Sequence, residues 1–372
     1  MRILMYLLLS CLPVLTIGQI RVSANQLPVP GDTVLFAVDN LPAGIQAGVP
    51  GENLRWDFTT LQAPFTQRTA WSTPAAGAPF PAANLQLRLG EETIMYFEKR
   101  NDGTVFQLGA TGQDPLRLGF TGSVKYAEPE LYRRAPLAYG DSYEHDYAFS
   151  QTIAAEDVPQ VLLDDLPITP DSFRVSLVGE RTDEVDAYGR MVLPGGFFEV
   201  VREKRTTVQS LKLEAKLGPF PWQDITDFVA TDDFPNERVQ VDYVFFSDEL
   251  NEPVAILEMG PEERFVARVT FSVPSETTNI QEVSKLEPGV YAFPNPAIIN
   301  VRFEFTNLPP GTYDLTIMNI LGIEVWKESY FLQGNRTERI DISNLRKGTY
   351  LYSLKDSRGK IITTKRLVVV RP

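Results

Sequence analysis

Cysteine is almost absent from this chain, since its 372 residues contain only one, Cys11. That residue lies in a hydrophobic stretch near the amino terminus, behind Met1 and Arg2. If the stretch is removed, the remaining chain can form no disulfide and offers no thiol nucleophile or thiolate metal ligand. Its stability must then come from the size of its hydrophobic core.

Histidine is equally scarce, and His145 is the only one. On a strand, His145 and Ser142 would point to opposite faces, so we do not predict a serine–histidine catalytic pair. No Gly-x-Ser-x-Gly turn presents a serine, and a zinc site with two histidine ligands cannot be built within one chain. No glycine-rich phosphate loop follows a strand, which argues against a nucleotide cofactor. We therefore assign no catalytic, cofactor-binding or metal-binding residue and lean against an enzyme, although glycosidase-type carboxylate pairs stay open.

Charge is divided unevenly along the chain, whose formal net charge is −13. Residues 285–372 contain 13 basic and 8 acidic side chains, whereas residues 19–284 contain 21 basic and 40 acidic ones. This acidic part of the chain, most of which is residues 19–273 (called the acidic region below), would repel a phosphate backbone, so we predict no nucleic acid partner. Calcium is possible because carboxylates are its preferred ligands, but the acidic segments 183–186 and 231–233 lack a specific calcium-loop spacing.

The amino terminus has the pattern of an export signal over residues 1–18. A hydrophobic stretch broken by Pro13 is too short to span a bilayer, and small residues before Gln19 predict cleavage there. A lipoprotein signal with Cys11 acylated is the alternative, but the residues after Cys11 stay hydrophobic through Leu15. No later stretch is predicted to be a transmembrane anchor.

The acidic region shows many short runs rich in aromatic and β-branched residues, which predict strands. Asn101-Asp102-Gly103 between two such runs predicts a hairpin, and Tyr188-Gly189 is interpreted as a break between strands. We expect an all-β fold with one or two antiparallel sandwiches, the two meeting near residues 151–169. Residues 274–288 lose the strand pattern and are predicted to be a linker.

Trp222 is the candidate for a ligand-binding aromatic in this region. It lies in the proline-rich segment Pro219-Phe220-Pro221-Trp222, which could hold it exposed for stacking on a sugar ring. Burial is the more common fate of a tryptophan, and Trp56, which alternates with Leu54 and Phe58, is predicted to be in the core.

The clearest alternation of apolar and polar residues lies at the end of the chain, in residues 289–372, which we call the C-terminal module. Val301, Phe303 and Phe305 share one strand face, and similar runs follow between turn residues such as Gly322, Gly348 and Gly359. This spacing predicts a small antiparallel sandwich of about seven strands.

The C-terminal module resembles the type A C-terminal sorting domain of type IX secretion substrates. The resemblance rests on four segments in the expected order: Tyr291-Ala292-Phe293-Pro294-Asn295-Pro296, then Asp314 to Val325, then Ile342 to Tyr350, and a hairpin through Gly359 into Lys365-Arg366-Leu367-Val368-Val369-Val370. The motif residues that it singles out are Pro294, Asn295, Pro296, Gly322, Gly348, Tyr350, Gly359 and Lys365.

The resemblance implies export across the inner and outer membranes to the cell surface or the medium. It implies recognition by an outer-membrane translocon, removal of the module by a sortase-like protease and possible attachment to surface lipopolysaccharide. The acidic region would be the cargo, and it resembles stretches of uncharacterised secreted proteins that carry the same domain. We expect it to be a non-enzymatic binding or structural surface component, with a carbohydrate-binding or carboxylate-based carbohydrate-active protein as the alternative.

Overall fold

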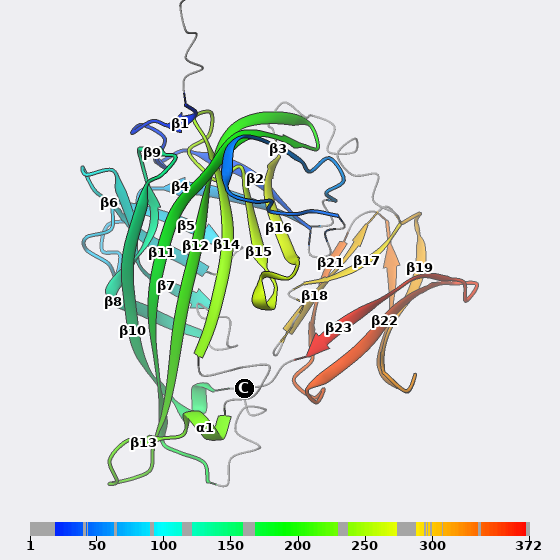
Figure 1. Ribbon diagram of the computed structural model, residues 1–372. Helices are drawn as coiled ribbons and strands as arrows, with labels where there is room; N and C mark the ends of the chain where they lie inside the picture. Colours follow the sequence, from blue (N-terminus) through cyan, green and yellow to red (C-terminus); the bar gives the residue numbers. More distant parts are fainter. Residues whose placement is uncertain are drawn as a thin grey trace, which may run out of the picture.

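A computed structural model of the chain (Figure 1) describes residues 19–369, apart from 40–41, 43, 63–64, 90–92, 114–120, 159–167, 230–236, 274–287, 294, 296, 298–299, 307 and 334–335. The described chain is almost entirely β, as the sequence predicts. The export signal, Cys11 and nearly all of the predicted linker lie outside the described residues. The boundaries 1–18, 19–273, 274–288 and 289–372 therefore stay predictions.

Strands of the acidic region overlap the strand-like runs of the sequence, but two long strands, β4 and β8, were missed, and β11 and β12 extend well beyond the runs 173–180 and 197–207 that predicted them. The bounds are β1 (Arg21–Val22), β2 (Thr33–Asp39), β3 (Gly51–Asp57), β4 (Phe65–Ser72), β5 (Leu85–Leu89), β6 (Thr93–Lys99), β7 (Thr104–Gln113), β8 (Thr121–Arg134), β9 (Leu137–Ala138), β10 (Ser142–Ala154), β11 (Ser172–Leu193), β12 (Gly196–Lys216), β13 (Gln223–Asp224), β14 (Glu237–Ser247), β15 (Ala255–Met259) and β16 (Val266–Val273). The described residues of this region also contain one helical turn, α1 (Thr226–Val229), and two 3-10 turns (Ala155–Asp157 and Pro261–Glu263). The predicted hairpin at residues 101–103 is confirmed, since β6 pairs with β7 across it.

A single 14-stranded sheet contains all of these strands except β1 and β9, which pair with each other. Twelve of its strands, all but β3 and β13, form a closed circuit in which each pairs antiparallel with the next, because β12 pairs with both β14 and β11. β10 and β11 pair directly with each other, so the sheet continues across residues 151–169, where two sandwiches were expected to meet. The number of sandwich layers stays a prediction.

The circuit is closed by the hairpin of β11 and β12, the two longest strands of the chain. They have 22 and 21 residues and pair along their whole length, from Ser172 and Lys216 to Leu193 and Gly196. In Figure 1 these two green strands run through the full height of the acidic region. The other edge of β11 is shared, because β10 pairs with its first half and β3 pairs parallel to its second half.

Gly189 corrects one sequence-based interpretation. It does not separate two strands but lies inside β11, where β3 approaches very closely. A Cβ atom at this position would lie 2.0 Å from the carbonyl oxygen of Leu54. Only glycine permits this contact, so the residue that resembled a turn marker is required by a strand-to-strand approach.

One face of the sheet is covered by the segment between β2 and β4. From this segment Trp56 packs edge-on against Phe245, with ring centroids 5.1 Å apart, and donates its indole N–H to the Ala47 carbonyl oxygen at 2.8 Å. Phe271 and Val200 join the same buried cluster. Trp56 is 4% exposed, which agrees with its predicted core position.

The opposite face receives the first residues after the predicted cleavage site. Val22 of β1 pairs with Leu137 of β9, and both are completely buried in a cluster with Val201 and Phe246. The backbone N–H of Ser23 donates to a carboxylate oxygen of Asp248 at 2.7 Å. The amino-terminal segment is therefore part of the folded core.

The C-terminal module consists of two sheets with a shared core. Among its described residues, β17 (Gly289–Phe293), β18 (Asn300–Thr306) and β21 (Arg336–Asp341) form one sheet, and β19 (Gly311–Asn319), β20 (Glu324–Leu332), β22 (Gly348–Asp356) and β23 (Ile361–Val369) form the other. Phe303 of the first sheet meets Tyr352 of the second with ring centroids 5.1 Å apart. The alternating apolar residues predicted to share a face, such as Val301 and Phe305, are completely buried.

The close approach at Gly189 can be tested by Gly189→Val. We expect the variant to lose about 2–3 kcal/mol of unfolding free energy, because the new side chain must push β3 away from β11. Urea denaturation would measure the loss. Gly122→Ala is the matched control, since a Cβ there meets no atom within 4 Å, and equal losses in both variants would contradict the proposed contact.

Candidate functional site

Asn295 is the motif residue with the most specific role in the C-terminal module. Its side-chain amide donates to the carbonyl oxygen of Arg366 at 2.8 Å, and its side-chain oxygen accepts the backbone N–H of Val368 at 2.8 Å. The backbone N–H of Ala297 adds a bond to the carbonyl oxygen of Val368 at 2.9 Å. The segment after β17 is thereby attached to the last described strand, β23. Pro294 and Pro296 lie outside the described residues.

The other motif residues shape turns or fill the core. Gly322 and Gly359 have φ of +79°, a conformation that glycine adopts without strain, in the turns after β19 and after β22. Gly348 begins β22 at φ +149°. Tyr350 is 8% exposed and donates its hydroxyl to the Arg346 carbonyl oxygen at 2.8 Å, while the Lys365 ammonium lies 3.1 Å from the centroid of the Tyr291 ring.

Strand register gathers most of these residues at one end of the module. Gly348 pairs with Val369 and Tyr350 pairs with Leu367, next to the residues that Asn295 contacts. Gly359 lies at the opposite end, in the β22–β23 turn. The motif thus stabilises the terminal strand and two turns, and it contains no arrangement of catalytic side chains.

Two residues that contribute here were missed from the sequence. The hydroxyl of Tyr352 accepts the backbone N–H of Ala292 at 3.1 Å, which links the two sheets. Asn319 caps the β19–β20 turn through its side-chain oxygen. Asparagine just before a glycine-containing turn could have indicated the second role, whereas the first depends on a contact between distant segments.

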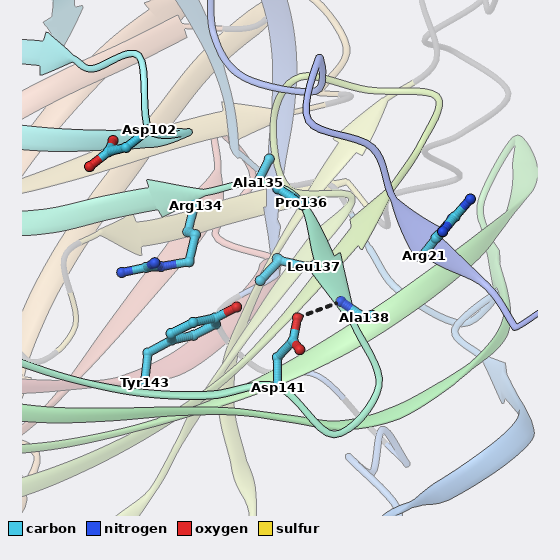
Figure 2. Close-up of a pocket in the computed structure, with 9 residues that line it drawn as sticks. All are labelled: Arg21, Asp102, Arg134, Ala135, Pro136, Leu137, Ala138, Asp141 and Tyr143. Atoms are coloured by element: carbon cyan, nitrogen blue, oxygen red, sulfur yellow. Dashed lines mark hydrogen bonds between the residues drawn. The ribbon is translucent and has the colours of Figure 1, made fainter.

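A hollow of about 350 Å³ lies at the end of the acidic region that the amino-terminal strand covers (Figure 2). Its lining comes from four separate segments: Arg21, Asp102, Arg134, Ala135, Pro136, Leu137, Ala138, Asp141 and Tyr143. The Arg134 guanidinium lies 4.0 Å from the Tyr143 ring centroid, and Figure 2 shows the two side by side. Two cations and two carboxylates thus share a small open space.

Each carboxylate of the hollow accepts hydrogen bonds from residues close to it in the sequence. Asp141 accepts the backbone N–H of Ala138 at 2.8 Å. Asp102 accepts both the hydroxyl and the backbone N–H of Thr104, and the hydroxyl bond lowers the pKa of Asp102 below its usual value. A carboxyl with a lowered pKa is a poor general acid at neutral pH, so Asp102 does not resemble one.

A layer of charged side chains crosses the interior of the acidic region. Asp183, Arg205 and Asp242 are direct neighbours on β11, β12 and β14. Arg181 forms an ion pair with Asp183 at 2.9 Å, and Arg205 forms one with Glu203 at 2.6 Å. Buried charges need such partners, since an unpaired one would cost several kcal/mol.

Glu252 and Arg133 extend this layer towards the amino-terminal segment. Glu252 is 1% exposed and accepts the Trp71 indole N–H at 2.7 Å and the Tyr132 hydroxyl at 2.9 Å. Arg133 donates to the Gln26 carbonyl oxygen at 3.0 Å. Burial raises the pKa of Glu252 to about 7 and that of Asp242 to about 6.

His145 and Trp222 both have structural contacts. The Nε2–H of His145 donates to the carbonyl oxygen of Pro129 at 2.8 Å, and its ring lies beside Phe106. Trp222 is half-buried, and the Arg174 guanidinium covers one face of its ring at 4.6 Å from the centroid. Trp222 does not lie in the hollow, so its sugar-binding role stays a prediction.

In the described part of the chain, no group of three or more histidine, cysteine, aspartate or glutamate residues is placed to hold a metal ion. Two carboxylates of segment 183–186, which was considered for calcium, instead meet arginines: Asp183 pairs with Arg181 at 2.9 Å and Asp186 with Arg202 at 2.8 Å. Segment 231–233 lies outside the described residues. Within the same described ranges, no helix combines the length and apolar character needed to cross a membrane.

Asn295→Ala should loosen the last strand of the module. We expect a loss of about 2 kcal/mol, since two hydrogen bonds to the β23 backbone disappear and each contributes about 1 kcal/mol. Amide hydrogen exchange at Val368 would report the change as faster exchange. Asn344→Ala, at an exposed position of the same module, is the control, and unchanged exchange at Val368 would rule out the clamp.

The buried carboxyls should make stability depend on pH. The folded state retains protons on Asp242 and Glu252 above the ordinary pKa values of 3.8 and 4.5. Their contribution to the unfolding free energy is therefore fully present below those values and is lost as pH rises through about 6 to 7. As pH rises from 5 to 8, the unfolding free energy of Asp242→Asn should increase by about 1–2 kcal/mol relative to that of the wild type.

Urea denaturation of both proteins at the two pH values would measure this gain. Glu237→Gln, which changes an exposed carboxyl at the start of β14, is the matched control. A stability difference between the wild type and Asp242→Asn that does not change with pH would contradict a raised pKa for Asp242.

Comparison with known proteins gives a family match for the C-terminal module. Residues 291–370 match the family model of the secretion system C-terminal sorting domain. No curated protein matches the chain. The matched segment runs from Tyr291 within β17 through β23 and includes the Asn295 clamp and both glycine turns. The chain is therefore a type IX secretion substrate with a C-terminal sorting domain, exported across the outer membrane to the cell surface or the medium.

Proposed function

We propose that the acidic region is a non-enzymatic binding or structural component of the outer surface. Glu252, a carboxyl of the acidic region whose pKa is raised to about 7, supports this proposal. Both of its oxygens are occupied by Trp71 and Tyr132, and it is 1% exposed. A glycosidase acid needs a raised pKa together with access to the glycosidic oxygen, and Glu252 has the first without the second.

The charged layer has a structural explanation in the same proposal. Arg181 of β11 lies 3.5 Å from Glu130 of β8, Arg205 of β12 donates to the Tyr132 carbonyl oxygen of β8 at 3.2 Å, and Arg133 holds the amino-terminal segment. The polar groups inside the strand circuit thus join strands to one another. An all-β protein without disulfides gains rigidity from such a network, which suits a component that works outside the cell.

We further propose that residues 1–18 direct the chain across the inner membrane, and that a sortase-like protease removes the C-terminal module after outer-membrane passage. The acidic region would then stay on the surface, attached to lipopolysaccharide, or be released. The segment before β17 supports a cleavage site there, since residues 274–288 lack the strand pattern of their neighbours.

Deletion of residues 350–372 should retain the protein in the periplasm. The deletion removes β23 and most of β22, so the sheet that includes the Asn295 clamp cannot form. Cell fractionation with immunoblotting would locate the protein. The Asn344→Ala chain is the control and should be exported normally. Normal surface amounts of the deleted chain would contradict a role of residues 350–372 in export.

Processing predicts that exported material lacks the module. Mass spectrometry of the surface or secreted protein should give a carboxyl terminus before Gly289 and an amino terminus at Gln19. Intact chains that end at Pro372 on the cell surface would contradict removal of the module.

The non-enzymatic proposal predicts that the purified protein does not hydrolyse a panel of fluorogenic glycosides above the buffer rate. Glu252→Gln and Asp242→Asn should behave like the wild type in this assay. Hydrolysis by the wild type that either substitution lowers a hundredfold would overturn the proposal, because loss of a catalytic carboxyl has an effect of that order.

A further inference from the structure

Exposed apolar side chains are concentrated at one turn of the C-terminal module. Ile320, Leu321, Ile323 and Val325 are 73%, 78%, 58% and 38% exposed and lie within six consecutive residues, which we call the apolar turn. Exposed apolar residues of the acidic region, by contrast, are scattered singly along the sequence. A cluster of this kind marks an interaction surface more often than an ordinary solvated turn.

The apolar turn is rigidly built. The backbone N–H groups of Leu321 and Ile323 both donate to the Asn319 side-chain oxygen at 3.0 Å, and the N–H of Gly322 donates to the Asn319 carbonyl oxygen at 2.9 Å. The three amides are therefore satisfied within the turn itself. Such a turn can enter an apolar phase with these N–H groups already paired. An unpaired N–H group would cost several kcal/mol there.

Basic side chains lie beside the apolar turn. Asn319 pairs with Tyr350, so the turn is next to the residues that lead into β22, where Arg346 and Lys347 are exposed. Arg366, also exposed, is the β23 partner of Leu351, which itself pairs with Met318. The turn is thus an apolar tip with one exposed acidic residue, Glu324, and with cations on the neighbouring strands, in a module that carries more basic than acidic residues.

This combination fits a membrane surface better than a protein groove. The tip is the end of a hairpin, and its side chains are aliphatic, whereas protein interfaces favour aromatic residues at their centres. Aliphatic side chains can enter the boundary between headgroups and acyl chains, and nearby Lys or Arg residues gain from anionic headgroups. We propose that the apolar turn of the sorting domain inserts into an anionic lipid surface during export, independently of what the acidic region does.

Vesicle co-sedimentation of the purified chain from Gln19 to Pro372 tests this proposal. We expect at least tenfold stronger binding to phosphatidylcholine vesicles with 30% phosphatidylglycerol than to pure phosphatidylcholine vesicles. The double variant Ile320→Ser with Leu321→Ser should bind the anionic vesicles at least tenfold more weakly. Arg346→Gln with Lys347→Gln should lower binding about tenfold at low salt and have little effect in 0.5 M NaCl.

The control pair is Phe331→Ser with Ile361→Ser. These residues are 59% and 55% exposed on the same sheet, but strand register places them at its other end. The control should bind as the wild type does, and unchanged thermal unfolding would show that all variants fold. The proposal is overturned if the wild type binds neither kind of vesicle, if it binds both equally, or if the control pair loses as much binding as the turn variant. An export defect of the turn variant without vesicle binding would assign the turn to a protein partner instead.

Discussion

Pairing between β11 and β12 is the interaction on which the acidic region depends. These strands pair from Ser172 and Lys216 to the turn at residues 194–195, and without them the other strands would form an open sheet with two long edges. Closure satisfies the backbone groups of both edges, which removes a common route to aggregation. It also creates two faces, one covered by the segment with Trp56 and the other by the amino-terminal segment with Val22.

Charge in the interior follows from the same closure. Because directly paired residues point to one side, Asp183, Arg205 and Asp242 form a row across three strands, and a closed circuit turns that row inward. The arginines stabilise neighbouring carboxylates, and burial raises the pKa of Asp242 and Glu252. Groups that would suggest catalysis at a surface act here as internal links between strands.

The C-terminal module places its fixed and its exposed residues at the same end. Asn295 secures β23 and Tyr350 fills the core, while the Asn319 cap holds an apolar turn in solvent nearby. Each of the first two stabilises the module, whereas the exposed side chain of Leu321 is available for the proposed lipid contact. The sorting domain thus combines a rigid, hydrogen-bonded frame with one exposed apolar turn.

The sequence alone determined the all-β class, the position of most strands and the sorting domain, because alternation with period two and turn residues are local signals. It could not identify β8, whose polar residues such as Glu130 and Arg133 belong to the interior charge layer. It also misassigned Gly189, since only the neighbouring β3 shows why that glycine is required. Tertiary structure alone decided which carboxylates are buried, that Arg174 covers Trp222, and that the strands close on themselves, because each depends on contacts between residues far apart in the chain.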